Sequence, residues 1–178
     1  MAFRVSDEVL SNATKGIVEM VTKPGMVNLD FADLRAVLKD SGYAVIGSGE
    51  GVGTSDGTSR AVVALENAIK SPMLDADLSN AKKALVNIIG GDSLTLREAE
   101  TIFQDISGRI SGDAMLKWGA RIEPDMQKDA LRVMIVVSGV EFPEYTENGI
   151  SKSLKKMEEI DLDEMFEEEK REKAQTSS

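Results

Sequence analysis

Four short runs of apolar residues alternate along this chain with segments of helical periodicity, and this alternation limits the folds that it can adopt. The runs have the length of buried strands and cover residues 42–46, 84–89, 114–122 and 130–140. Apolar residues that recur every three or four positions predict helices over about 5–21, 30–40, 58–70 and 96–110. The order is helix, helix and then βαβαββ, which predicts an α/β (α+β) domain built on one sheet.

The connections between the runs predict how the strands pair. Helices that cross between strands give parallel neighbours. The segment 123–129 is short enough to join the last two strands as an antiparallel hairpin. We therefore expect a mixed four-stranded sheet. Thr95 and Glu98 have the spacing of a capping box, which predicts the start of the fourth helix.

The first predicted helix is apolar along much of its length, although almost nothing precedes it. Two interpretations stay open at this point. The helix packs against a missing N-terminal neighbour or a partner, or it is an ordinary terminal helix that packs on its own sheet.

The residue types that the chain lacks restrict its chemistry. It has no histidine and no cysteine. This removes the commonest general base and metal ligand, and it excludes disulfides and thiolate zinc sites. Any catalysis must therefore use carboxylates, lysines or a bound cation.

The net charge of −10 is spread over both parts of the chain. Residues 150–178 carry six basic and nine acidic side chains, a net of −3, and the 15 basic and 22 acidic side chains before them give −7. Two acidic parts argue against nucleic acid or anionic lipid as a direct partner. No apolar run approaches the roughly 20 residues that a bilayer span needs, and residues 1–4 are not a signal sequence. We expect a cytoplasmic protein without direct membrane insertion.

Asn28, Asp30 and Asp33 form an acidic corner where a loop runs into the second predicted helix. Two carboxylates three residues apart at a helix start share one face, and such a pair is able to position and polarise a water molecule. The plainer interpretation is that Asp30 caps the helix and Asp33 favours its positive end. Residue types alone favour capping, and the corner has the composition of half an active site.

A glycine-rich segment at residues 47–57 follows a strand and precedes a helix, as phosphate-binding loops do. However, Glu50 and Asp56 lie inside it, and no Lys-Ser or Lys-Thr pair follows. Negative side chains there would repel phosphate. The sequence predicts a flexible surface connection, and an independent enzyme for phosphate ligands is the less favoured hypothesis.

Residues 22–34 closely resemble the synergy loop of the FtsZ family, the prokaryotic relatives of tubulin. Three further segments match the family in order, at residues 42–47, 71–74 and 85–96. The resemblance covers about residues 2–141, and its character is archaeal.

The resemblance implies three parts. Residues 1–27 would be the central core helix and the start of the synergy loop, 28–141 the tubulin/FtsZ-like C-terminal domain, and 142–178 a charged linker and tail that is expected to be largely disordered. The family's nucleotide-binding half, with its Gly-Gly-Gly-Thr-Gly signature, is absent. The chain is therefore expected to be an expressed fragment or a natural half-protein, and Met1 at a helix start favours the fragment.

The resemblance also implies roles for residues. In the family, GTP sits on the N-terminal domain of one subunit, and the synergy loop of the next subunit completes the site. Asp30 and Asp33 would orient and polarise the attacking water, and Asn28 would help to fix the geometry. Phe3 and Asp7 fall where the family contacts the guanine. Mg²⁺ is expected to accompany GTP, and no metal site is expected in this chain.

The chain is thus expected to be the GTPase-activating and polymer-contact half of a tubulin-like cell-division GTPase, and to be inactive alone. Its partners would be a homopolymer formed through longitudinal contacts and the N-terminal GTP-binding domain of its own or a neighbouring subunit. Residues 160–166 of the tail are a candidate peptide for a membrane tether or regulator. The expected location is the cytoplasm at the division site. The alternative is a non-catalytic module that caps filaments or regulates them.

Overall fold

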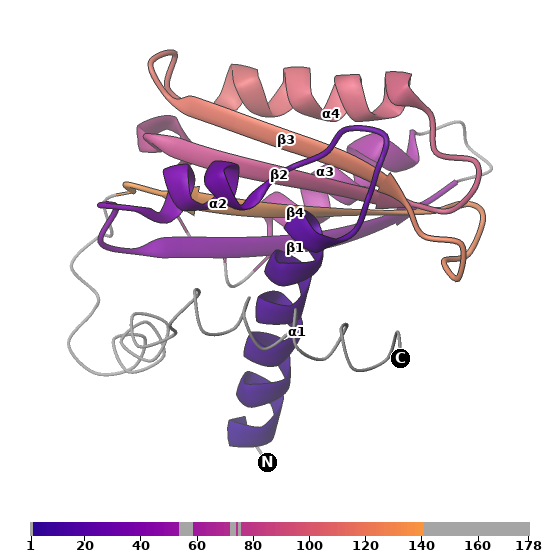
Figure 1. Cartoon of the computed structure of the whole chain (residues 1–178), viewed down its shortest axis with the longest axis horizontal. Helices are drawn as coiled ribbons and strands as arrows, with labels where there is room; N and C mark the ends of the chain where they lie inside the picture. Colours follow the sequence, from indigo (N-terminus) through magenta and orange to yellow (C-terminus); the bar gives the residue numbers. More distant parts are fainter. Residues whose placement is uncertain (1, 54–58, 72–73, 75, 141–178) are drawn as a thin grey trace, which may run out of the picture. The chain divides into compact units, whose positions relative to one another are not determined.

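The computed structural model describes residues 2–53, 59–71, 74 and 76–140, with the backbone alone for residues 2–10. The helices are α1 (Ala2–Thr22), α2 (Phe31–Leu38), α3 (Arg60–Ile69) and α4 (Leu96–Arg109), and a 3-10 turn covers Leu78–Asn80. The strands are β1 (Ala44–Val52), β2 (Lys83–Gly90), β3 (Met115–Ile122) and β4 (Ala130–Ser138). The predicted order of helices and strands is confirmed (Figure 1).

The four strands form one mixed sheet in the order β1-β4-β2-β3. β2 and β3 are parallel, whereas β4 runs antiparallel to both β1 and β2. The predicted mixed sheet is confirmed, but the predicted hairpin between β3 and β4 is wrong. The reason lies in burial: almost every residue of β4 is buried, as a central strand requires, whereas much of β3 stays partly exposed. β4 therefore inserts between β1 and β2, and β3 takes an edge.

The prediction of a flexible loop over residues 47–57 is also wrong in its first half. Residues 47–52 belong to β1 and pair with β4. Residues 54–58 lie outside the described part of the chain.

The glycines of β1 serve close packing. A Cβ atom at Gly49 would lie 2.2 Å from the backbone nitrogen of Ala68, and one at Gly51 would lie 2.1 Å from the backbone oxygen of Arg60. Because real side chains do not tolerate such distances, only glycine lets α3 approach the strand this closely.

Helices cover both faces of the sheet (Figure 1). On one face, α3 packs on β1, and Phe103 of α4 contacts Trp118 of β3 with ring centroids 5.5 Å apart. On the other face, Gly16 of α1 meets Met134 of β4, and the hydroxyl of Ser138 donates a 2.6 Å hydrogen bond to a carbonyl of α2. The largest fully buried side chains come from the sheet and its covering segments: Leu34, Leu65, Leu74, Leu85, Ile88, Ile102, Ile106, Leu131 and Ile135.

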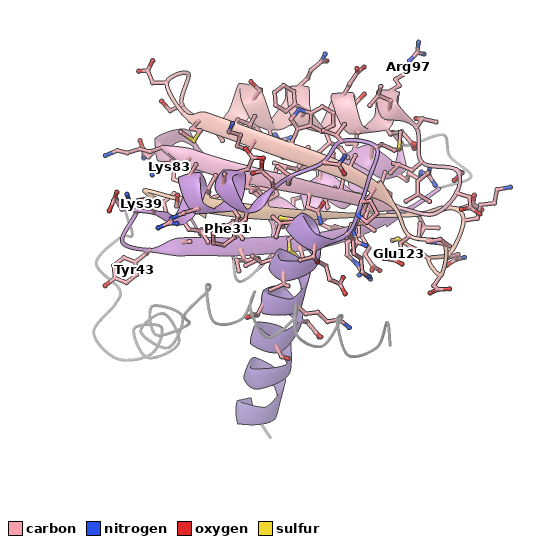
Figure 2. All side chains as sticks on the ribbon, viewed as in Figure 1. Phe31, Lys39, Tyr43, Lys83, Arg97 and Glu123 are labelled. Atoms are coloured by element: carbon pink, nitrogen blue, oxygen red, sulfur yellow. The ribbon has the colours of Figure 1, made fainter. Side chains whose placement is uncertain are left out.

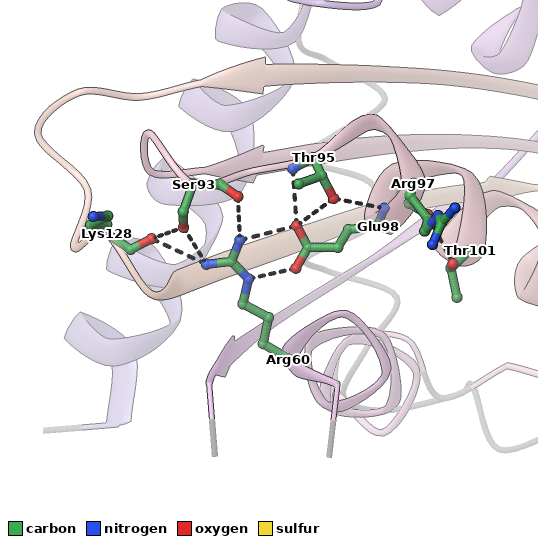
Figure 3. Close-up of polar contacts among 7 residues, drawn as sticks. All are labelled: Arg60, Ser93, Thr95, Arg97, Glu98, Thr101 and Lys128. Carbon is green, nitrogen blue, oxygen red and sulfur yellow. Dashed lines mark hydrogen bonds and ion pairs between the residues drawn. The ribbon is translucent and has the colours of Figure 1, made fainter. Parts of the chain in front are cut away.

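The predicted capping box at the start of α4 is confirmed, and it carries a further contact (Figure 3). Arg60, which is 9% exposed, forks onto Glu98 with N–O distances of 2.7 and 3.0 Å. Its guanidinium also donates to the hydroxyl and carbonyl oxygens of Ser93 and to the carbonyl of Lys128. The Arg60 guanidinium lowers the pKa of Glu98, against the effect of burial. This cluster joins the start of α3, the start of α4 and the segment before β4.

Within the described residues, no helix combines the length and the hydrophobicity needed to cross a membrane. The tail at residues 142–178 lies outside the described part, so the predicted three-part division remains a prediction.

Candidate functional site

The loop at residues 23–30 is held against the free edge of β3. Val27 and Ala120 form an isolated antiparallel bridge, in which each N–H donates to the other's carbonyl at 3.0 Å. Leu29 is buried and lies over Gly119, where a Cβ atom would approach the Leu29 side chain to 2.8 Å. The β3 edge therefore fixes the path of this loop.

Asn28 folds the loop back on itself. Its Oδ1 accepts a 2.8 Å hydrogen bond from the backbone N–H of Gly25. The side-chain amide nitrogen of Asn28 has no partner among the described residues, and the residue is exposed. The amide can therefore donate outward while its oxygen holds the turn.

Asp30 and Asp33 form a reciprocal capping box at the start of α2. Asp30 Oδ1 accepts from the N–H of Asp33 at 2.9 Å, and Asp33 Oδ2 accepts from the N–H of Asp30 at 3.1 Å. The capping interpretation of these residues is thus confirmed as geometry. The capping box does not occupy every carboxylate oxygen: Asp30 Oδ2 has no partner among the described residues, and Asp30 is exposed.

Asp33 is held more tightly than Asp30. Its Oδ1 lies 3.3 Å from Nζ of Lys117 on β3, and its side chain is 25% exposed. The pKa of Asp33 is lowered, first by the hydrogen bond from the backbone of Asp30; burial opposes this, and Lys117 lowers the pKa further. The corner therefore carries one anchored carboxylate and one outward-facing carboxylate.

A second charged cluster holds the beginning of the loop, and sequence reasoning missed it. Arg121 on β3 is 5% exposed and donates to Glu19 of α1 at 3.1 Å and to Glu123 at 2.5 Å. Lys23 lies 3.4 Å from Glu19 and 3.3 Å from Glu123. Burial would raise the pKa of Glu123, but Lys23 and Arg121 together lower it. An arginine between the apolar residues Ala120 and Ile122 of a predicted strand was the available signal.

Figure 2 labels Phe31, the first residue of α2, and Glu123, which directly follows β3 and pairs with Lys23 at the beginning of the loop. Phe3 and Asp7 belong to α1, but their side chains are not described, so their predicted contact with guanine remains a prediction. Among the residues with described side chains, no three acidic, histidine or cysteine groups come together to hold a metal ion.

The corner has a limited chemical repertoire. The exposed residues Asp30 and Asn28 keep a carboxylate oxygen and an amide N–H₂ available on a loop that is bridged to β3. Neither a histidine base nor a phosphate-binding loop accompanies them in the described residues. Such groups can orient a water molecule and contact an oxyanion that another molecule presents.

Solved structures with the same fold define the class of this protein. An empty FtsZ dimer from M. jannaschii matches with a TM-score of 0.68 and 43% identity, over 78% of this chain and 39% of that chain. CetZ2 from Haloferax volcanii, solved as a GTPγS-bound protofilament, matches at a TM-score of 0.53 and 18% identity, over 74% of this chain and 38% of that chain, which shows a shared fold alone. The fold is that of the C-terminal part of the tubulin-like proteins.

Sequence comparison narrows the class to a family. The FtsZ family C-terminal domain matches residues 42–141. Cell division protein FtsZ 1 of Archaeoglobus fulgidus is 44% identical over 144 residues, which cover 81% of this chain and 38% of that relative. The chain belongs to the FtsZ family, as the resemblance of its synergy loop predicts, and it spans about two fifths of the length of the relatives that it matches.

Proposed function

We propose that this chain supplies the hydrolysis-activating loop and polymer contacts of an FtsZ-type cell-division GTPase. The acidic corner of Asn28, Asp30 and Asp33 completes the site of a GTP molecule that the N-terminal domain of a neighbouring molecule holds. The observation that carries this proposal is the exposure of Asn28 and Asp30 on a loop that a pair of backbone hydrogen bonds joins to β3. A water-orienting group must be both accessible and fixed.

Phosphoryl transfer suits this arrangement because it depends mainly on position and on the control of charge. In our proposal, Asp30 Oδ2 accepts a hydrogen bond from the attacking water and orients it toward the terminal phosphate. Asp33 holds Asp30 in place through the capping box and adds to the field on the water. The outward amide of Asn28 donates to a phosphate oxygen or to the same water. Groups supplied in trans to other nucleotide hydrolases are worth about 10³–10⁵ in rate.

Each GTP would be bound mainly by an N-terminal domain. Phe3 and Asp7 of α1 would lie near the guanine held by the N-terminal domain of their own subunit, whereas the acidic corner would serve the nucleotide of the neighbouring subunit. Mg²⁺ would accompany GTP on that domain. The side chains described here do not gather a set of metal ligands, so we assign the metal no resident site and no step in this part of the chain.

The same proposal covers partners and place. The dimer of the M. jannaschii relative and the protofilament of the H. volcanii protein support a homopolymer built through longitudinal contacts. Family membership supports action at the division site, in the cytoplasm. A tether or regulator that binds residues 160–166 remains part of the proposal, although those residues are outside the described part.

A filament-capping or regulatory module is the second candidate. The observation in its favour is that the capping box gives Asp30 and Asp33 a structural use that needs no nucleotide. Such a module would dock on a neighbour without raising the rate of hydrolysis.

Phosphate release from a mixture separates the two candidates. Full-length A. fulgidus FtsZ 1 is diluted in a buffer that contains GTP until it releases no more phosphate than a sample without protein. This chain is then added in excess. We expect a saturable rise in phosphate release that Asp30→Asn abolishes. Filament shortening with no rise at any concentration of the wild-type chain would support the capping module and overturn the activating role.

A further inference from the structure

Lys117 is a basic residue in the middle of β3, a strand that packs on both faces. Its neighbour Trp118 faces α4, where it contacts Phe103. Because side chains alternate along a strand, Lys117 lies on the opposite face, the face covered by α2. Its Nζ lies 3.3 Å from Asp33 Oδ1, and its side chain is 42% exposed.

This contact completes the set of partners around Asp33. One carboxylate oxygen accepts from the backbone of Asp30, and the other pairs with Lys117. In contrast, the Asp30 carboxylate uses one oxygen in the capping box and leaves Oδ2 without a partner among the described residues. Lys117 is therefore what distinguishes the two carboxylates of the corner.

We propose that Lys117 is a positioning residue for the acidic corner: by holding the Asp33 carboxylate in the capping box, it fixes the orientation of Asp30 toward the water and offsets one of the corner's two negative charges. This inference rests on the proposed function and deepens it. An exposed ion pair contributes little to stability. The role of Lys117 is therefore expected in the geometry and charge of the corner more than in the stability of the domain.

Charge gives a second reason for a cation at this place. In the proposed assembly, two carboxylates approach a triphosphate that is itself strongly negative. Like charges repel strongly at short range where water screens them little. Lys117 compensates the Asp33 carboxylate, so that the outward Asp30 carboxylate meets the nucleotide with less added repulsion. The charged groups that act on Asp33 are Asp30 from the loop and Lys117 from β3.

The first arm of the test uses this chain alone, which separates the contact from any activity. The side-chain carboxyl carbon of Asp33 is titrated by NMR in the wild type, in Lys117→Met, which keeps the apolar stem, and in Lys117→Arg, which keeps the cation. We expect the pKa of Asp33 to rise in Lys117→Met and to stay near its wild-type value in Lys117→Arg. Lys70→Met is the matched control, because Lys70 pairs with Glu66 in an exposed contact on α3, which covers the opposite face of the sheet. A pKa of Asp33 that is equal in the wild type and in Lys117→Met would overturn the inference.

The second arm measures the stimulated phosphate release of the diluted A. fulgidus relative. We expect Lys117→Met to lower the plateau of stimulation about tenfold. This is the lower end of the loss seen in metalloenzymes when a residue that holds a metal ligand in place is removed, and we use it here as a scale for a residue that holds a carboxylate. The chain concentration for half-maximal effect should change less than about twofold, because Lys117 acts through Asp33 and not on docking. Lys117→Arg should restore most of the plateau, and Lys70→Met should leave it unchanged. In Lys117→Met, the acid limb of the pH profile should shift upward, since Asp33 then protonates more easily.

The outcomes distinguish the two levels of the proposal. If the wild-type chain stimulates release, Asp30→Asn abolishes it and Lys117→Met behaves like the wild type, the role of Lys117 is wrong and the proposed function stands. A loss that appears only in the half-maximal concentration would make Lys117 a docking residue and would also overturn the inference. If the wild-type chain gives no stimulation, the proposed function fails and the inference fails with it.

Discussion

At the scale of single residues, the acidic corner shows how one set of side chains serves a structural and a proposed chemical role together. Asp30 closes the start of α2 with one oxygen and leaves the other exposed. The two ends of the Asn28 amide differ in the same way: its oxygen accepts a hydrogen bond from Gly25, and its nitrogen has no partner among the described residues. Substitutions that keep one role and remove the other can therefore separate them.

Asp30 offers such a pair of substitutions. Asp30→Ala removes the cap and should lower the free energy of unfolding by about 1 kcal/mol, whereas Asp30→Asn keeps a capping oxygen and should remain within about 0.5 kcal/mol of the wild type. Both should abolish stimulated phosphate release, because both remove the carboxylate. Urea denaturation and the release assay, run on the same samples, check this. If Asp30→Asn still stimulated phosphate release, the negative charge of Asp30 would not be needed for stimulation, which would contradict the proposed role.

Glu98 predicts how stability depends on pH. Its pKa is lowered in the folded protein by Arg60, so its contribution is fully present above the ordinary carboxyl pKa and is lost as the pH falls through the folded value. Glu98→Gln should cost about 2 kcal/mol of unfolding free energy at pH 7, the scale of a hydrogen bond to a charged group. This difference should shrink in acid below about pH 4, because protonated Glu98 resembles glutamine.

Denaturation midpoints from pH 7 down to pH 3 measure this difference. Glu100→Gln, at an exposed position on the same helix, serves as the control and should show little change at any pH. A difference between the wild type and Glu98→Gln that stayed constant over the whole range would mean that the ion pair does not depend on the charge of Glu98.

At the scale of elements, the sequence predicted what local patterns determine and failed where distant segments decide. Apolar periodicity was enough to find α1 to α4 and the four strands, and Thr95 with Glu98 was enough to find the start of α4. The same patterns did not predict which strands are neighbours. The short connection 123–129 is compatible with a hairpin, but β4 is buried along almost its whole length and lies between β1 and β2.

The glycines of β1 and the contacts of the site illustrate the same limit. By residue type, Gly49 and Gly51 indicated a flexible loop. In the structure they lie under α3, which leaves no room for a Cβ atom at either position. The capping pair Asp30 and Asp33 could be predicted from its spacing, whereas its partner Lys117 is remote in sequence and becomes visible only when β3 is in place.

Glycine at position 49 should therefore be required for stability. Gly49→Ala places a Cβ atom 2.2 Å from the backbone of α3 and should lower the free energy of unfolding by about 3 kcal/mol or more. Gly53→Ala meets no atom within 4 Å and should stay within about 0.5 kcal/mol of the wild type. Urea denaturation of the two variants decides this. Equal stability would mean that α3 does not rest on β1 as closely as the structure has it.

At the scale of the whole molecule, the described unit joins a helix, a loop and a sheet so that the edge of β3 sets the position of the acidic corner. Ion pairs of Lys23 with Glu19 and Glu123 fix one end of the loop, and the pair of Lys117 with Asp33 fixes the other. A loop fixed at both ends and exposed between them suits a partner that arrives from outside. In an FtsZ filament this partner would be the nucleotide of the adjacent subunit.

The central claim is that the corner serves a nucleotide held by a different molecule. A crystal structure of this chain bound to the N-terminal domain of the A. fulgidus relative, loaded with a slowly hydrolysed GTP analogue, tests it most directly. We predict that Asp30 Oδ2 faces the terminal phosphate across a single water, with hydrogen bonds of about 2.6–3.2 Å. A complex in which Asn28, Asp30 and Asp33 point away from the nucleotide, or are covered by another surface, would contradict the account.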